Sequence, residues 1–206
     1  MALADRPDTV DYYDQDAQTF ARRYDAVAFD AVHASLVRFL PPAGANVLDI
    51  GAGSGRDARA MAARGLCVTA IEPSPAFRAL ASDSDGVHWI DDRLPDLASL
   101  RVNDRRYQFI LCSAVLMLLP ATQLAASFTA MAALLDVDGK LAVSLRDPVE
   151  GEPVDLVHVH PDEVILKAAV GAGLSSVAQA ITPDALGRPM HRWRTFVFAS
   201  PHSLSR

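Results

Sequence analysis

The chain has 206 residues, of which 50% are hydrophobic and 21% are charged, and its formal net charge is −6. This length and composition are typical of one compact domain and exclude a disordered or fibrous chain. The acidic balance also argues against a nucleic-acid partner, because such affinity depends on clustered lysine and arginine.

Membrane and metal roles have little support in the sequence. The longest apolar run, Phe109 to Leu119, is shorter than the ~18 residues of a membrane-spanning helix, and the N-terminus lacks the apolar stretch of a secretory signal. We therefore expect no membrane partner and a cytoplasmic location. Cys67 and Cys112 lie in apolar stretches that predict buried strands, so we expect neither a disulfide nor a metal site.

The N-terminal segment has the residue spacing of helices. Apolar and aromatic residues recur at roughly helical intervals from Asp14 to Leu40, and Pro41-Pro42 closes the segment. We expect one or two amphipathic helices here. They would form a helical segment over residues 1–42 of a single domain, whose core spans residues 43–206.

Two strands and two helices follow, which together make a βαβ unit. Gly65 is expected to end the first helix, and the second helix begins with Ser74 as its N-cap and Pro75 at its first position. The pattern predicts, in order, a strand over 46–50, a glycine turn over 51–55, a helix from about Arg56 to Arg64, and a strand over 66–71.

The later elements continue this alternation. The last two strands are joined by a turn-rich loop over 182–189, so they should pair antiparallel. The whole order predicts an α/β, Rossmann-like fold: a seven-stranded, mostly parallel sheet with helices on both faces and a terminal antiparallel strand pair. The expected elements are strands over 87–90, 107–113, 140–145, 174–181 and 193–199, a long helix over 121–135, and a helix opened by 160–163 and ended by Gly173.

The glycine turn carries most of the functional signal. Glycines let the backbone approach a ligand and adopt positive φ, so the sequence GAGSG over 51–55 predicts a nucleotide-like ligand. The dinucleotide fingerprint places its third glycine where this chain has Arg56, and an acid, Asp49, precedes the turn. The turn is therefore a poorer match to an NAD site.

An acidic residue stands where a ribose would be bound. Glu72 lies 21 residues after Gly51, at the end of the second predicted strand, where its carboxylate can accept hydrogen bonds from both ribose hydroxyls. An NAD site would use the same group. The alternative is a solvated carboxylate near a helix N-terminus.

These segments resemble class I S-adenosylmethionine-dependent methyltransferases. The resemblance rests on Val47–Asp57, on Val68–Phe77 and on the order of the later elements, and it spans nearly the whole chain. It implies S-adenosylmethionine as cofactor and S-adenosylhomocysteine as product. It also implies cofactor-binding roles for the residues of the glycine turn and of the second-strand corner, namely Asp49, Gly51, Ala52, Gly53, Gly55, Arg56, Glu72, Pro73 and Ser74.

The resemblance extends to the ends of the third and fourth strands. In the family, an acidic residue after the third strand usually accepts a hydrogen bond from the adenine amino group. Asp91 and Asp92 are the alternatives here, with Asp92 favoured and the backbone of Arg93 beside the ring. The acid that does not bind adenine would cap a helix. The methionine portion of the cofactor is expected against Cys112, Ser113 and Ala114. The family commonly has Asp at the position of Gln108 and often His near Leu118, so no catalytic base is predicted in this loop.

The N-terminal helical segment resembles a lid that folds over the cofactor in similar methyltransferases. Tyr13, Phe20 and Tyr24 would cover the methyl-transfer centre, since aromatic faces attract a sulfonium and exclude water, and Arg23 would meet the cofactor carboxylate. The alternative is that these aromatics are only the apolar stripe of a docked helix.

Several residues are candidates for the substrate side. Arg146 ends the fifth predicted strand and either anchors a substrate or pairs with Asp147 or Asp155. Three histidines, which are largely neutral at pH 7, are candidates for a catalytic base: His158, His160 and His191. His158 would also contact substrate, and His160 has the alternative role of capping a helix.

The sequence as a whole predicts methyl transfer from S-adenosylmethionine to a small-molecule acceptor, because the terminal strand pair leaves little material for an added substrate domain. The acceptor itself is not identified, and fold analogy does not supply it. Two other readings stand beside this one: a noncatalytic S-adenosylmethionine-binding module and, on the strength of Glu72, an NAD-dependent oxidoreductase.

Overall fold

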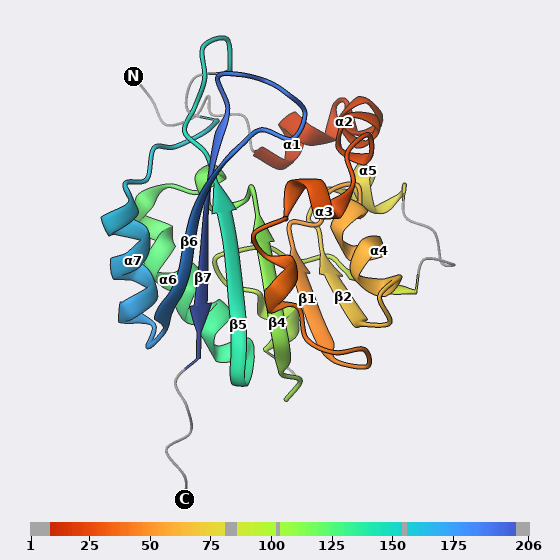
Figure 1. Ribbon diagram of the computed structural model, residues 1–206. Coiled ribbons are helices and arrows are strands. Elements are labelled where there is room, and N and C mark those ends of the chain that lie inside the picture. Colours follow the sequence, from red (N-terminus) through yellow and green to blue (C-terminus); the bar gives the residue numbers. More distant parts are fainter. Residues whose placement is uncertain (1–8, 81–85, 102–103, 154–155, 201–206) are drawn as a thin grey trace, which may run out of the picture.

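The structure is a computed structural model that describes residues 9–80, 86–101, 104–153 and 156–200 (Figure 1). Within these ranges, the strands form one seven-stranded sheet with the order β3-β2-β1-β4-β5-β7-β6. The strands are β1 (Asn46–Ile50), β2 (Cys67–Ile71), β3 (Val87–Ile90), β4 (Tyr107–Ser113), β5 (Leu135–Leu145), β6 (Ser175–Pro183) and β7 (Arg192–Ala199).

Strands β1 to β5 pair with one another in parallel. Strand β7 lies between β5 and β6 and runs antiparallel to both. In the centre of the sheet, Val47 of β1 lies opposite Val68 of β2 and Phe109 of β4. This topology confirms the predicted Rossmann-like sheet with its terminal antiparallel pair. It also brings the carboxyl ends of β1, β2, β4 and β5 to one edge, which is where open α/β sheets bind ligands.

Helices cover both faces of the sheet, as predicted. Successive residues of β4 alternate between two core clusters, since Phe109 packs with α4 and α3 whereas Ile110 packs with α6 and α7. Residues buried on both faces of a sheet are apolar at successive positions, which explains the apolar run from Phe109 to Cys112 in β4. The helices are α1 (Thr9–Asp14), α2 (Ala17–Asp25), α3 (Phe29–Val32), α4 (Arg56–Ala62), α5 (Pro75–Arg78), α6 (Ala121–Leu134) and α7 (Asp162–Gly171), with 3-10 turns η1 (Val37–Phe39), η3 (Ala98–Leu100) and η4 (Leu116–Leu118).

The N-terminal segment differs from the prediction of one or two amphipathic helices. It contains three short helices and the turn η1, because its apolar residues pack in separate places. Ala17 and Ala21 of α2 pack against Phe77 of α5, whereas Phe29 of α3 joins the core cluster under α4. Extended backbone at Ala28 separates the two parts.

Helix ends follow the predicted signals closely. The Ser74 hydroxyl accepts the Phe77 N–H at 3.0 Å, and Pro75 is the first residue of α5. Gly173, at φ +82°, turns the chain after α7, where the Leu174 N–H bonds the Ala169 carbonyl at 3.0 Å.

Two sequence expectations about strands were wrong. Cys67 is exposed at the first position of β2, because the strand begins there and not one residue earlier, whereas Cys112 is fully buried. Strand β5 starts at Leu135, directly after α6, because Leu135 already pairs with Tyr107 before the chain reaches the expected start at Lys140. No helix in the described ranges is long and apolar enough to cross a membrane.

We predict that Phe128→Ala lowers the free energy of unfolding by about 3–5 kcal/mol. Phe128 is fully buried in α6, and its ring meets that of Phe198 on β7 edge-on, with centroids 5.7 Å apart. Urea denaturation measures the change. The matched control is Val170→Ala in α7, because Val170 is 68% exposed. Equal effects of the two substitutions would show that the α6 face is not a packed core.

Candidate functional site

A cavity of about 750 Å³ opens at the carboxyl edge of the parallel strands. Its walls come from the strand ends, from the N-terminal helices and from the loop between β6 and β7. Figure 1 shows α1 and α2 lying above the ends of β1 and β2, beside the blue loop that joins β6 to β7. The volume lies within the range of small-molecule and cofactor sites.

The turn between β1 and α4 forms one wall out of bare backbone. Gly51, Gly53 and Gly55 have φ of +69°, +54° and +80°, in the left-handed region that favours glycine. A Cβ on Gly51 would lie 2.3 Å from Cγ2 of Val115, so the turn passes tightly against the loop after β4. A Cβ on Gly53 would meet no atom within 4 Å, and Gly53 lines the cavity. Backbone therefore faces any ligand here.

Glu72 joins this turn to the end of β2. Its carboxylate accepts the Gly53 N–H at 2.7 Å on one oxygen and the Ser74 N–H at 2.8 Å on the other, and only 6% of the residue is exposed. Burial raises the pKa of Glu72, although the two N–H groups act in the opposite direction. Glu72 and Ser74 line the cavity together with Pro73. The carboxylate keeps further lone pairs for a ligand hydroxyl.

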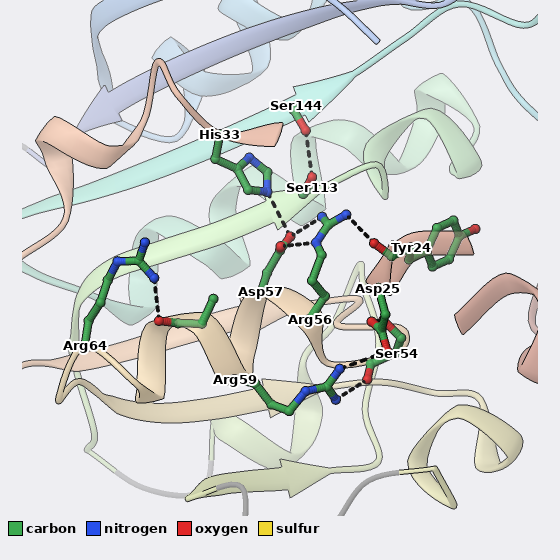
Figure 2. Close-up of polar contacts among 11 residues, drawn as sticks. Tyr24, Asp25, His33, Ser54, Arg56, Asp57, Arg59, Arg64, Ser113 and Ser144 are labelled. Carbon is green, nitrogen blue, oxygen red and sulfur yellow. Dashed lines mark hydrogen bonds and ion pairs between the residues drawn. The ribbon is translucent and has the colours of Figure 1, made fainter. Parts of the chain in front are cut away.

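Arg56 lies on the cavity wall, held by a network of charged side chains whose contacts Figure 2 shows. The Arg56 guanidinium donates two bonds to Asp57, at 2.7 and 2.9 Å, and a third to the Tyr24 carbonyl at 3.3 Å. On the other side of the carboxylate, Nε2 of His33 lies 2.8 Å from Asp57. Burial acts to raise the pKa of Asp57, but His33 and Arg56 outweigh it and hold that pKa well below its usual range.

Asp49 lies beneath the glycine turn and not on the cavity wall. It is buried, and its Oδ2 has no hydrogen-bond partner among the described residues. Burial therefore raises the pKa of this carboxyl well above its usual range. Its predicted cofactor contact remains a prediction, because any contact would have to pass through the turn.

The structure separates the two adjacent acids after β3. Asp92 lines the cavity and accepts the N–H groups of Arg93 at 2.8 Å and Ser99 at 2.7 Å. Asp91 is exposed and forms an ion pair with Arg78 at 2.8 Å. The geometry agrees with the preference for Asp92, and Arg93 lies on the wall beside it.

Two of the three residues expected against the methionine portion of the cofactor, at the end of β4, lie on the cavity wall. Ser113 and Ala114 line the cavity, and Ala114 has φ +61°, which is uncommon for a residue with a Cβ. Cys112 is fully buried in the core instead, where burial raises the pKa of its thiol. Side chains alternate across a strand, so Cys112 and Ser113 point to opposite faces.

The N-terminal helices cover part of the cavity. Tyr13 and Tyr24 line it, and Tyr24 stacks on Phe77 with ring centroids 6.4 Å apart. Burial raises the pKa of Tyr24 to about 12. The Asp14 carboxylate accepts the Ser74 hydroxyl and, at 3.0 Å, the Ala76 N–H, so α1 is bonded directly to the second-strand corner.

Two residues of the predicted lid lie outside the cavity wall. Arg23 is exposed, and its guanidinium carbon lies 5.8 Å from the centre of the Phe20 ring. Arg56 occupies the wall near Tyr24 instead. Phe20 stacks on Tyr24 at 6.1 Å between centroids, as a docked apolar stripe would.

Arg146 pairs differently from the sequence expectation. The guanidinium is buried and bonds the Glu152 carboxylate, with one contact at 2.9 Å, whereas the predicted partner Asp147 bonds Arg194 at 2.7 Å. The expected ion pair with Asp147 was wrong, because the loop after β5 folds back and brings Glu152 onto Arg146, whereas the alternative of substrate anchoring stays a prediction. Asp155, the other expected partner, lies outside the described residues. Arg146 does not line the cavity.

The three histidine candidates also lie away from the cavity wall as far as the structure describes it. His160 caps no helix, because Pro161 takes the N-cap position of α7; its Nε2 lies 3.0 Å from the Leu119 carbonyl instead. The His158 ring lies 6.1 Å from that of His160. Burial, together with two arginines, lowers the pKa of His191.

The sequence matches a family model described as a methyltransferase domain over residues 13–203. The chain belongs to this family. No curated protein sequence matches the methyltransferase domain significantly. The match to the family model gives no support to the alternative of an NAD-dependent oxidoreductase.

Solved structures share the fold of this methyltransferase domain at low identity. Magnesium protoporphyrin IX methyltransferase from Synechocystis PCC 6803, with bound S-adenosylmethionine, is 18% identical with a TM-score of 0.70, covering 97% of this chain and 100% of that one. The 1,6-didemethyltoxoflavin-N1-methyltransferase from Burkholderia thailandensis, with its substrate and S-adenosylhomocysteine bound, is 19% identical with a TM-score of 0.63, covering 92% and 80%. The [4+2]-cyclase SpnF is 13% identical with a TM-score of 0.70, covering 96% and 97%.

Sequence reasoning missed the far wall of the methyltransferase domain's cavity. This wall comes from Ser144 of β5, from residues 183–186 and Arg188 of the β6–β7 loop, and from Trp193 and Thr195 of β7. The loop was interpreted only as a connection, although loops at the ligand-binding edge of a sheet commonly carry function. Asp184 organises it, since its carboxylate accepts the Trp193 indole N–H at 2.9 Å and two bonds from Arg188, at 2.7 and 3.0 Å.

We predict that Asp184→Asn destabilises the methyltransferase domain by about 2 kcal/mol at neutral pH. Burial acts to raise the pKa of Asp184, but the bonds from Arg188 and Trp193 outweigh it and hold that pKa well below its usual range. A carboxylate with a lowered pKa stabilises the fold above its ordinary pKa of about 4, and the contribution falls as the pH drops towards the lower value.

Urea denaturation of both proteins over a pH series measures this difference. The difference should be constant near neutral pH and should shrink below pH ~4. Asp16→Asn is the control, because Asp16 is exposed and its side chain caps no helix. A difference that grew on acidification would contradict the assigned role of Asp184.

Proposed function

We propose that this methyltransferase domain binds S-adenosylmethionine and transfers its methyl group to a small-molecule acceptor. The observation that carries the proposal is the position of Glu72, a buried carboxylate at the end of β2 that is bonded to the backbone of the glycine turn. A cis-diol such as ribose offers two hydroxyl donors at the spacing of one carboxylate. Two of the similar structures contain this cofactor or its product.

The residues present fit such a cofactor. Glu72 would hold the ribose and Asp92 the adenine amino group, since both carboxylates lie on the wall on the side of β2 and β3. The bare backbone of Gly53 leaves room for the amino-acid tail, which would reach Ser113 and Ala114 at the end of β4. The Arg56 guanidinium lies on the same wall, where its bonds to Asp57 and to the Tyr24 carbonyl hold it in place beside the glycine turn.

Positioning accounts for the chemistry proposed for this chain. The cofactor supplies, when bound, a methyl group on a positively charged sulfur. Tyr13 and Tyr24 cover the cavity from the N-terminal side, so they exclude water and present aromatic faces to that charge. We propose on this basis that residues 1–42 form a lid over a core of residues 43–206. In-line methyl transfer gains most from orientation and desolvation, so it requires no strong base on the wall.

A second candidate is a protein that binds the cofactor without transferring a methyl group. The fold is shared with a [4+2]-cyclase, and the described part of the cavity wall includes no histidine. Cofactor binding with no S-adenosylhomocysteine release, across acceptors of several classes, would favour this candidate.

We predict that Glu72→Gln weakens S-adenosylmethionine binding at least about tenfold, because hydrogen bonds to a charged group contribute roughly 1.5–3 kcal/mol. An amide has one accepting oxygen, so it cannot serve the N–H groups of Gly53 and Ser74 and a diol as well. Isothermal titration calorimetry measures the affinity.

The control is Glu163→Gln, an exposed glutamate in the first turn of α7. Circular dichroism establishes that both variants fold. An unchanged affinity in a folded Glu72→Gln protein would remove the basis of the proposed function.

A further inference from the structure

Three hydroxyl groups lie side by side at the ends of the central strands. Ser113 of β4 is directly opposite Ser144 of β5, which is directly opposite Thr195 of β7. Residues paired in this way point to the same face of a sheet. Figure 2 shows the first two hydroxyls pointing toward each other, and their oxygens are 2.8 Å apart. We call these three residues the hydroxyl row.

The hydroxyl row crosses the floor of the cavity. All three residues line it, although Ser144 and Thr195 are only 4% and 7% exposed. One end of the row, Ser113, adjoins Ala114 on the cofactor side. The other end, Thr195, lies beyond β5 towards the β6–β7 loop. The Ser113 and Ser144 hydroxyls bond each other, and each hydroxyl of the row keeps lone pairs that can accept a further hydrogen bond from a ligand in the cavity.

An aromatic wall stands beside the far end of the row. Trp193 lies two residues before Thr195 on β7, so both side chains point to the same face, and both line the cavity. The indole N–H is bonded to Asp184, which Arg188 holds by two further bonds. The ring is therefore fixed in orientation before a ligand enters, which reduces the entropy cost of stacking against it.

The charged groups at this end already have partners. Arg188 and Asp184 form an ion pair at 2.7 Å, and Arg146, whose guanidinium carbon is 6.0 Å from the centre of the Trp193 ring, is paired with Glu152. An ionic ligand would have to break such a pair, which leaves a buried charge uncompensated. The remaining wall is largely apolar, from Leu118, Leu119, Ala185 and Leu186.

We propose that this end of the cavity takes a flat, uncharged aromatic acceptor, with its ring against Trp193 and its polar substituent hydrogen-bonded to the hydroxyl row. The inference rests on the proposed function, because it places the acceptor beyond the methyl donor. The row then has a positioning role: it holds the substituent that carries the attacking atom at the boundary between the two ligands. Trp193 selects the shape of the acceptor, and the internal ion pairs select against charge.

The test uses three probes with one carbon frame, namely naphthol, naphthoate and decahydronaphthol. Naphthol is flat and uncharged at neutral pH, naphthoate is flat and anionic, and decahydronaphthol is uncharged and not flat. Each is titrated by calorimetry into the full chain saturated with S-adenosylhomocysteine. Naphthol should bind about tenfold more tightly than either of the other probes. Only naphthol can both stack flat against Trp193 and enter the site without breaking an internal ion pair.

Variants locate the binding site of the probe. Thr195→Val removes one hydroxyl and keeps the side-chain shape, and it should weaken naphthol binding about fivefold. Trp193→Leu should weaken it by a similar or larger factor, and Ser144→Ala provides a second test of the row where Trp193→Leu does not fold. Thr129→Val is the control, because Thr129 lies on the exposed side of α6 and its hydroxyl bonds the Ala125 carbonyl.

The outcomes separate this inference from the proposed function. Naphthoate or decahydronaphthol binding as tightly as naphthol would overturn the inference, as would unchanged naphthol affinity in Thr195→Val, or no probe binding to the S-adenosylhomocysteine complex. Failure of S-adenosylhomocysteine itself to bind would instead overturn the proposed function. The same titrations on the free protein would then decide whether the aromatic site exists.

Discussion

The tight turn between β1 and α4 determines the geometry of the cavity. Its glycines adopt left-handed backbone, and the first of them is so close to the loop after β4 that a single methyl group would collide with Val115. The same turn presents the Gly53 N–H to the Glu72 carboxylate, so the ends of β1 and β2 meet in one hydrogen-bonded corner. The same geometry leaves bare backbone on the cavity side. One steric constraint thus places both the acid and the space that a nucleoside would need.

The N-terminal helices are joined to this corner by polar bonds as well as by aromatic packing. The Asp14 carboxylate accepts hydrogen bonds from Ser74 and Ala76, which follow Glu72. His33 bonds Asp57, and Asp57 in turn bonds Arg56. The bonds are buried or partly buried, where hydrogen bonds to charged groups are stronger than on the surface. The N-terminal helices that cover the cavity are therefore bonded directly to α4, the helix after the glycine turn, and to the residues that follow β2.

Local patterns predicted most of the sheet and one half of the cavity. The bounds of β1, β3 and β4 agree with the structure, because each is a short, mainly apolar segment between turn or loop residues. Glu72 was singled out by its spacing to Gly51 together with its position at the end of the second predicted strand. The N-terminal helices were less predictable, since their apolar residues divide between two packing surfaces that only the folded chain defines.

The other half of the cavity depends on contacts that no local pattern encodes. Thr195 and Ser144 are far apart in the sequence and meet through the antiparallel register of β5 and β7. The sequence favoured Asp92 over the adjacent Asp91 only by resemblance, and it is the direction of the chain after β3 that places Asp92 on the cavity wall and Asp91 outside it. Arg23 was expected beside the cofactor carboxylate, but it is exposed outside the cavity wall, because the sequence does not show which side of α2 faces the core.

A crystal structure of the chain with S-adenosylhomocysteine would be the strongest test of the proposed cofactor site. We expect both ribose hydroxyls within hydrogen-bond distance of the Glu72 carboxylate, with the amino-acid tail along the backbone of Gly53. A nucleoside bound elsewhere, or a Glu72 carboxylate without contact to the ribose, would contradict the proposal.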